Sequence, residues 1–126
     1  MRYLALDVGD RRVGLAVGDD TFGLTRALPT LRRSRRLADD VSTLARIAAQ
    51  EEVDAIVIGL PLTLSGTVGA QARRTQVFAA ACDAIGLPVE LYDERNTTVE
   101  ALRRGAVDPD AGAARVLLED LLATRR

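Results

Sequence analysis

The chain has 126 residues, of which 48% are hydrophobic and 28% charged, a composition typical of one folded domain over residues 1–126. It contains one cysteine and no histidine, which excludes an intrachain disulfide, an imidazole base and a zinc site of the cysteine–histidine kind. No stretch is apolar for long enough to cross a membrane, and the first residues do not resemble a signal peptide. We therefore expect a cytoplasmic protein without membrane partners.

Arginine supplies all 17 basic residues, and these are distributed unevenly along the sequence. Residues 1–36 carry a net charge of +4, whereas residues 37–126 carry a net charge of −5. This asymmetry suits a chain that contacts a partner through one face. A solvated surface would give the same pattern, so charge alone does not identify a partner.

The first predicted element is a strand over residues 3–9, a short apolar run that contains Asp7 and stops at a glycine. A strand over 13–18 follows a polar turn and would form a hairpin with it. Asp7 then stands at the carboxyl end of a core strand, where open α/β sheets place their chemistry. Capping of the following turn explains a lone aspartate equally well. The hairpin glycines would let a phosphate or nucleotide approach closely: Gly9, Gly14 and Gly18.

A third strand is predicted over 24–31, at an edge of the sheet because it contains Pro29. Ser34 is expected to cap the following amphipathic helix. The apolar positions of that helix are spaced by three and four residues: Leu37, Val41, Leu44 and Ala48. Strand 54–59 follows this helix, and we expect it to pair in parallel with an earlier strand.

The second half continues with a loop over 62–69, which we expect to be mobile because it is rich in glycine and hydroxyl residues. A helix over 70–85 contains Cys82 among alanines, which indicates a small buried side chain and not a nucleophile. A last strand over 88–93 follows. Two further helices are predicted, one from a capping box at Thr97 to Gly105 and one opening at Pro109.

Three acids are expected to face one edge of this sheet, namely Asp7, Glu94 and Asp110. Asp110 continues the inward stripe of the last helix. Each acid has a simpler explanation alone, such as a favourable helix dipole for Asp110 or a surface ion pair for Glu94. Together, in a chain without histidine, they favour a site for Mg²⁺ or Mn²⁺. Such a site suits phosphodiester hydrolysis, because two ions about 3.5–4 Å apart can stabilise both the attacking and the leaving oxygen.

These residues resemble the YqgF (RuvX-like) group of the ribonuclease H-like superfamily. The opening pattern of that group is Asp-x-Gly-x-x-Arg-x-Gly-x-Ala, and its third block is Asp-Glu-Arg-x-Thr-Thr. The matching residues are Asp7, Gly9, Arg12, Gly14 and Ala16; residues 59–62 with Gly66, Gln71 and Ala72; Asp93, Glu94, Arg95, Thr97 and Thr98; and Asp110, Ala113, Ala114 and residues 117–119. The resemblance covers nearly the whole chain.

The resemblance implies an α/β fold of the ribonuclease H-like kind. Its sheet would have five mixed strands, three in an antiparallel meander and then parallel strands, with helices on both faces. Asp7, Glu94 and Asp110 would be the catalytic acids and would hold Mg²⁺ or Mn²⁺. Members of the group are described as metal-dependent nucleases that process the 5′ end of precursor 16S rRNA, and earlier as Holliday junction resolvases.

Nucleic-acid contacts are expected from basic and hydroxyl residues near these acids: Arg11, Arg12, Arg73, Arg74, Arg95, Thr97, Thr98 and the cluster 32–36. The backbone would be approached closely at Gly9, Gly14 and Gly59. Aromatic residues make up only 3% of the chain, so recognition should depend on phosphate charge and shape, and affinity should fall as salt rises.

The preferred partner is RNA, most simply a pre-ribosomal particle. One alternative is a resolvase for branched DNA, which would require a homodimer. Another is a ribosome-assembly factor that binds nucleic acid without cutting it. A third is a small nucleotide-binding ATPase domain, since sugar kinases and actin-like ATPases also place a glycine hairpin after an N-terminal aspartate. At 126 residues, we expect the chain to lack the second lobe that such ATPases need.

Overall fold

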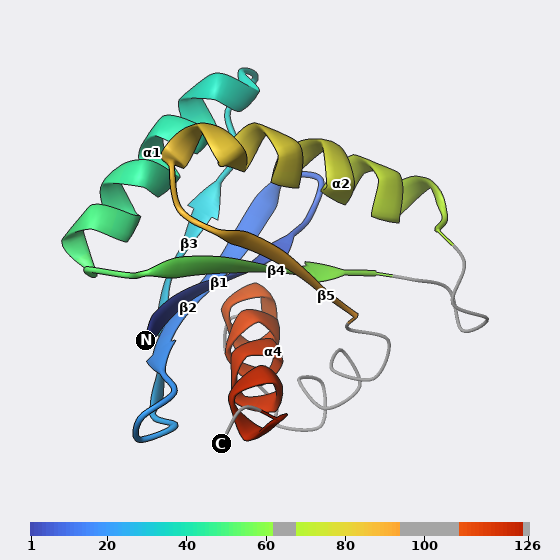
Figure 1. Cartoon of the computed structure of the whole chain (residues 1–126). Coiled ribbons are helices and arrows are strands. Elements are labelled where there is room, and N and C mark those ends of the chain that lie inside the picture. The colour runs from blue at the N-terminus through green and yellow to red at the C-terminus, as the bar shows by residue number, and fades with distance from the viewer. Residues whose placement is uncertain (62–67, 94–108, 125–126) are drawn as a thin grey trace.

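The computed structural model describes residues 1–61, 68–93 and 109–124. Its strands are β1 (Arg2–Val8), β2 (Arg12–Asp19), β3 (Thr25–Arg32), β4 (Ala55–Leu60) and β5 (Val89–Asp93). Its helices are α1 (Leu37–Gln50), α2 (Ala70–Cys82), the short 3₁₀ helix η1 (Asp83–Ile85) and α4 (Pro109–Thr124). The strands form one sheet in the order β3-β2-β1-β4-β5 (Figure 1).

The central strand of the sheet is β1, which is buried along most of its length. It pairs antiparallel with β2 and parallel with β4, while β3 and β5 extend the sheet at its two edges. Pro29 therefore lies in an edge strand, as predicted. The mixed sheet, with an antiparallel meander followed by parallel strands, confirms the predicted fold class.

Helices cover both faces of this sheet, with α1 and α2 on one face and α4 on the other (Figure 1). Two separate clusters of buried side chains correspond to these layers. Leu4 and Leu6 of β1 belong to the cluster under α1 and α2, whereas Tyr3 and Ala5 belong to the cluster under α4. Because side chains alternate along a strand, Asp7 lies on the α4 face.

The α4 helix packs closely on the sheet through the apolar stripe that its sequence predicts. The buried residues of this stripe include Ala114, Leu117, Leu118 and Leu121. A Cβ atom at Gly18 would lie only 2.9 Å from the Cδ2 atom of Leu118 and 2.9 Å from the Leu24 carbonyl oxygen. The lack of a side chain at Gly18 thus allows α4 to pack closely on β2. The expectation that Gly18 leaves room for a phosphate is wrong.

The start of α1 differs from the prediction that Ser34 caps it. The N-cap residue is Arg36, which makes no capping hydrogen bond through its side chain. Asp40, in the first turn of α1, accepts a hydrogen bond of 2.8 Å from the Ser34 backbone N–H. The Ser34 hydroxyl bonds instead to the Arg36 backbone. A buried carboxylate inside the helix therefore organises this junction.

Two of the expected segments, the loop core at 62–67 and the short helix from Thr97 to Gly105, lie outside the described residues. The helix predicted over 70–85 ends earlier, at Cys82, and continues as η1. It closes at Gly86, whose φ of 87° is a left-handed conformation that favours glycine. Among the helices in the described part of the chain, none is long and apolar enough to span a membrane.

Candidate active site and nucleic-acid interface

Asp7 lies near the carboxyl end of β1 and is half-buried. Its partner on β2 is Gly14. On the other side, Leu6 pairs with Ile58 of β4, so the next residues, Asp7 and Gly59, lie at one level. Both glycines are themselves buried. Because both neighbours of Asp7 are glycines, the adjacent positions of β2 and β4 place no side chain beside its carboxylate on that face of the sheet.

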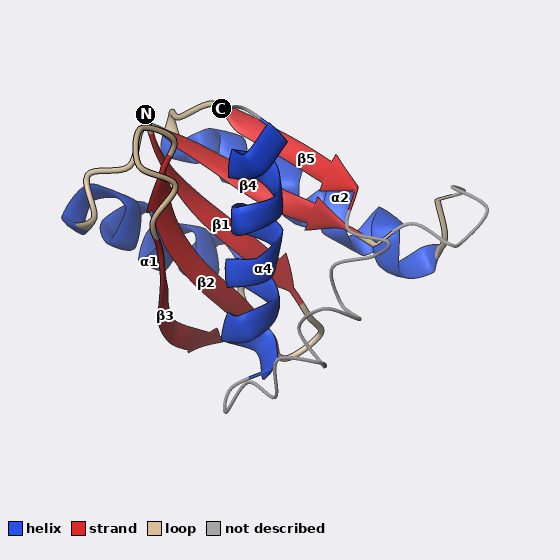
Figure 2. Ribbon diagram, turned by 90° about the horizontal axis from the view of Figure 1, so that it is seen from below, coloured by secondary structure: helices blue, strands red, loops and turns tan. Residues whose placement is uncertain are grey.

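The first turn of α4 lies at the same end of the sheet. In Figure 2, α4 runs in the opposite direction to β1, and its first turn is found where β1 stops. Asp110 precedes Leu118 by eight residues of helix, or about 12 Å. Leu118 packs at Gly18, which follows Gly14 by four residues of strand, or about 13 Å. Since Gly14 is the cross-strand partner of Asp7, the backbone of Asp110 lies close to the level of Asp7 along the sheet.

The third predicted acid, Glu94, directly follows the last residue of β5, and it lies outside the described residues together with Arg95, Thr97 and Thr98. Within the side chains that the structure describes, no three acidic, cysteine or histidine residues lie close enough to hold a metal. The structure thus describes Asp7 and the helix that carries Asp110. The three-acid site remains a prediction.

Exposed arginines surround this end of the sheet. We call this set the arginine border: Arg11, Arg12, Arg32, Arg35, Arg36 and Arg73. Arg12 and Arg32 are cross-strand partners in β2 and β3, and like charges placed opposite each other destabilise a sheet. Among the described residues, no member of the border makes an ion pair. Arg74, beside it, forms an exposed pair of 3.5 Å with Asp10.

The opposite end of the sheet has a different charge arrangement. Arg2 and Arg26 both pair with Glu51. The N-terminal ammonium group lies 2.8 Å from Asp20. Within the described part of the chain, the arginine border thus lacks the carboxylate partners that these groups have. An exposed, uncompensated basic surface of this kind is typical of a site that binds phosphate groups.

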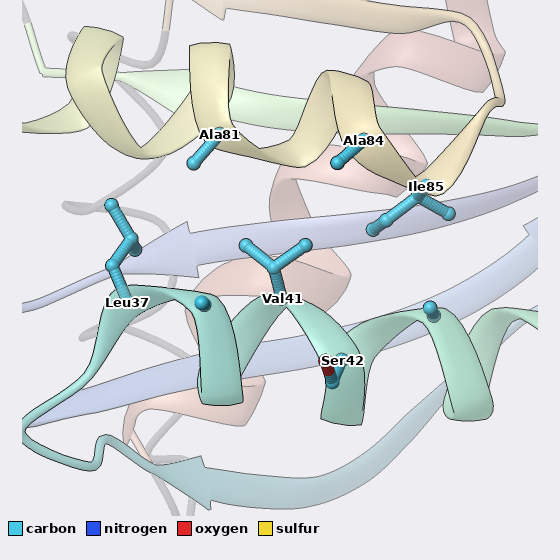
Figure 3. A pocket seen from close by; sticks show the side chains of 8 residues that line it. Leu37, Val41, Ser42, Ala81, Ala84 and Ile85 are labelled. Carbon is cyan, nitrogen blue, oxygen red and sulfur yellow. The ribbon is translucent and has the colours of Figure 1, made fainter.

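An apolar hollow of about 480 Å³ lies between α1 and the end of α2 with η1 (Figure 3). Side chains that line it include Leu37, Val41, Ser42, Ala81, Ala84 and Ile85. Its lining contains neither a carboxylate nor an arginine, and it lies on the face of the sheet opposite to Asp7. The hollow is therefore separate from the candidate active site.

Cys82 is buried, as its alanine-rich surroundings predict. Burial raises the pKa of its thiol to about 11, so at pH 8 only about one molecule in a thousand carries the reactive thiolate. We expect a disulfide reagent to label the folded protein at least ~100-fold more slowly than the chain unfolded in urea. Because Cys82 is the only cysteine in the sequence, the absorbance of the released thiol measures this rate directly. Equal rates in both states would contradict its burial.

The sequence interpretation missed one cluster near the site, formed by Arg33, Asp40 and Phe78. Arg33 Nε lies 3.7 Å from Asp40 Oδ2, and the guanidinium carbon lies 5.1 Å from the centre of the Phe78 ring. One signal could have identified Asp40. It lies three residues after Leu37 and four before Leu44, so it is an acid on the apolar stripe of α1.

Comparison with known proteins gives a consistent result. The RuvX family model, described as Holliday junction resolvase, matches residues 1–124. A protein of Anaeromyxobacter sp. (strain Fw109-5), named "Putative pre-16S rRNA nuclease", is 42% identical, and the match covers 99% of this chain and 98% of that protein. A relative of the same name from Moorella thermoacetica is 39% identical over 100% of this chain and 81% of that protein.

The fold has a counterpart among solved structures. The structure of Thermus thermophilus RuvC in complex with a Holliday junction substrate matches with a TM-score of 0.66 at 16% sequence identity. The match covers 99% of this chain and 96% of that chain. At this level of identity the likeness concerns the fold, which is that of RuvC and the ribonuclease H-like proteins.

Proposed function

The chain belongs to the RuvX family, whose model matches residues 1–124, and on this basis we propose that it is a metal-dependent nuclease that processes the 5′ end of precursor 16S rRNA. The curated relatives named above support RNA as the substrate. The observation that carries the proposal is the position of Asp7. Its half-buried carboxylate lies between two glycine positions, at the end of the sheet bordered by arginines for which the described residues supply no ion-pair partner.

The proposed metal ligands are Asp7, Glu94 and Asp110. Their oxygen donors fit Mg²⁺ or Mn²⁺, and the chain has no histidine to favour zinc. A divalent ion supplies Lewis-acid activation of water and neutralises the charge that develops on the phosphate. A pair of such ions is the arrangement typical of nucleases.

The protein's own residues would perform the other tasks. Asp7 would hold the metal from the end of a buried strand. Because Gly14 and Gly59 have no side chains, neither would obstruct a phosphate that approaches this carboxylate. The arginine border would bind the phosphates on either side, because Arg12 and Arg32 lie beyond β1 in one direction and Arg73 lies in the first turn of α2 in the other.

Resolution of four-way DNA junctions is the second candidate function. The description of the family model and the fold shared with RuvC favour it. The same phosphodiester chemistry would serve both substrates, but a resolvase needs two copies of this site acting on one junction. The oligomeric state of the protein in solution, monomer or dimer, therefore helps to separate the two functions.

The test is a cleavage assay of the purified protein on three substrates, each with Mg²⁺, Mn²⁺ or EDTA. The substrates are an RNA that carries the 5′ extension of precursor 16S rRNA, a single-stranded DNA of equal length and a four-way DNA junction. The proposal expects metal-dependent cutting of the RNA, most rapidly when it is presented in a pre-ribosomal particle. Preferential cutting of the junction by a dimer would support the resolvase, and binding to all substrates without cutting would support the assembly factor.

The arginine border gives a separate prediction about affinity. Replacing Arg12 or Arg73 by glutamine should weaken RNA binding by about threefold to tenfold at every sequence tested. It should also reduce the slope of log affinity against log salt by about one. Fluorescence anisotropy at several salt concentrations measures both effects. Arg46→Gln is the matched control, since Arg46 is an exposed arginine further along α1. Equal loss in the control would show that the border has no special role.

A further inference from the structure

Arg33 joins three separate parts of the molecule next to the turn that follows β1. Its Nη1 group donates a hydrogen bond of 2.9 Å to the Gly9 carbonyl oxygen, and its backbone N–H donates one of 2.9 Å to the Arg11 carbonyl oxygen. The guanidinium group also lies against Asp40 of α1 and over the Phe78 ring of α2. One side chain thus connects both helices of this face to the β1–β2 turn.

The turn that Arg33 contacts is tight and lies directly beside Asp7. The Gly9 backbone N–H donates to the Arg12 carbonyl oxygen at 2.8 Å, and a Cβ at Gly9 would lie only 3.0 Å from that oxygen. Only Val8 separates Asp7 from Gly9. A shift of the Gly9 carbonyl would therefore pass directly to the end of β1 and to the carboxylate of Asp7.

The surroundings of Arg33 show that its position is well defined. Its side chain is 25% exposed, in contrast to the exposed arginines of the border, and that of Asp40 is 3% exposed. Asp40 Oδ2 is buried without a hydrogen bond, so the charge of Arg33 at 3.7 Å is its main compensation. Arg33 is therefore partly buried among groups that fix its side chain, and its guanidinium is engaged with Gly9, Asp40 and Phe78.

We propose that Arg33 is a positioning residue for Asp7. Arg33 holds the β1–β2 turn against α1 and α2, and so fixes the Asp7 carboxylate where the metal and the scissile phosphate would meet. The inference rests on the proposed nuclease function, because it concerns the same carboxylate. Replacing a residue that orients a metal ligand typically costs about 10- to 100-fold in metal affinity or activity. Arg33 acts through the backbone of the turn and does not touch the substrate.

The test compares Arg33→Met, Arg33→Lys, Arg35→Met and Arg46→Met. We expect Arg33→Met to lower kcat by about 10- to 100-fold and to weaken Mn²⁺ binding, measured by calorimetry without substrate, by a similar factor. KM for RNA should stay within about twofold, because Arg33 does not contact phosphate. Arg33→Lys keeps a charged donor, so its losses in kcat and in Mn²⁺ affinity should be smaller than those of Arg33→Met. Arg35→Met should raise KM alone, and Arg46→Met should change nothing.

Hydrogen exchange of the Gly9 amide provides a readout that needs neither metal nor substrate. In Arg33→Met this amide should exchange faster, while amides in the centre of β1 keep their protection. Unchanged kcat, Mn²⁺ affinity and Gly9 exchange, whatever the change in melting temperature, would overturn the inference. If the wild-type protein cuts no substrate, the proposed function fails, and Mn²⁺ binding and Gly9 exchange still decide the role of Arg33.

Discussion

Replacing Asp7 by asparagine is expected to abolish cleavage, with a loss of about 10³-fold or more in the single-turnover rate. The amide has nearly the volume of the carboxylate, so the packing between Gly14 and Gly59 should not change. It lacks the negative charge that holds a divalent ion, and the loss of several kcal/mol of transition-state stabilisation corresponds to a rate factor of this size. The cleavage rate is measured with enzyme in excess over a labelled RNA.

Asp54→Asn is the matched control for this substitution. Asp54 precedes β4 at the opposite end of the sheet, where its Oδ2 atom accepts a hydrogen bond from the Arg2 backbone N–H. Asparagine retains an oxygen at this place, so cleavage should continue at the wild-type rate. RNA binding should persist in both variants, because the arginine border is intact. A fully active Asp7→Asn protein would exclude Asp7 from catalysis and favour the assembly factor that binds without cutting.

Truncation of Leu118 to alanine is expected to lower the free energy of unfolding by about 2–5 kcal/mol. Leu118 is fully buried between α4 and the sheet, at the place where only a glycine fits on β2. Its removal leaves a cavity that the tightly packed layer cannot fill. Urea denaturation followed by circular dichroism measures the loss.

Leu24→Ala makes the same chemical change at a position that is 75% exposed. It should alter the free energy of unfolding by no more than about 0.5 kcal/mol. If both variants changed the free energy of unfolding by a similar amount, the packing of Leu118 at Gly18 would not be what stabilises α4 on the sheet. Because α4 carries Asp110, Leu118→Ala should also lose activity at a lower temperature than the wild type, and Leu24→Ala should not.

Those parts of the fold that depend on local pattern could be predicted from the sequence. The buried runs of β1 and β4 and the apolar stripes of α1 and α4 each follow from the spacing of apolar residues. The location of Asp7 at the end of β1 follows from the same pattern. Glu94 and the side chain of Asp110 remain predictions.

Contacts between distant segments were not predictable in this way. Ser34 is a residue type that often caps helices, but its backbone N–H donates a hydrogen bond to Asp40, and the N-cap residue is Arg36. Gly18 resembles the other glycines of its hairpin, yet its role depends on a leucine a hundred residues later. The cluster of Arg33, Asp40 and Phe78 likewise combines three segments that no local rule connects.

Because the described residues place unpaired arginines at one end of the sheet and paired charges at the other, we expect an electric dipole moment along the strands, although the net charge is only −1. A polyanion would attract the arginine border and so favour approaches in which the end of the sheet that carries Asp7 faces it. Productive collisions would then be more frequent than for an evenly charged sphere, and added salt would slow association more than dissociation. A protein with a pI of about 5.4 would, for the same reason, be retained by a column of immobilised heparin.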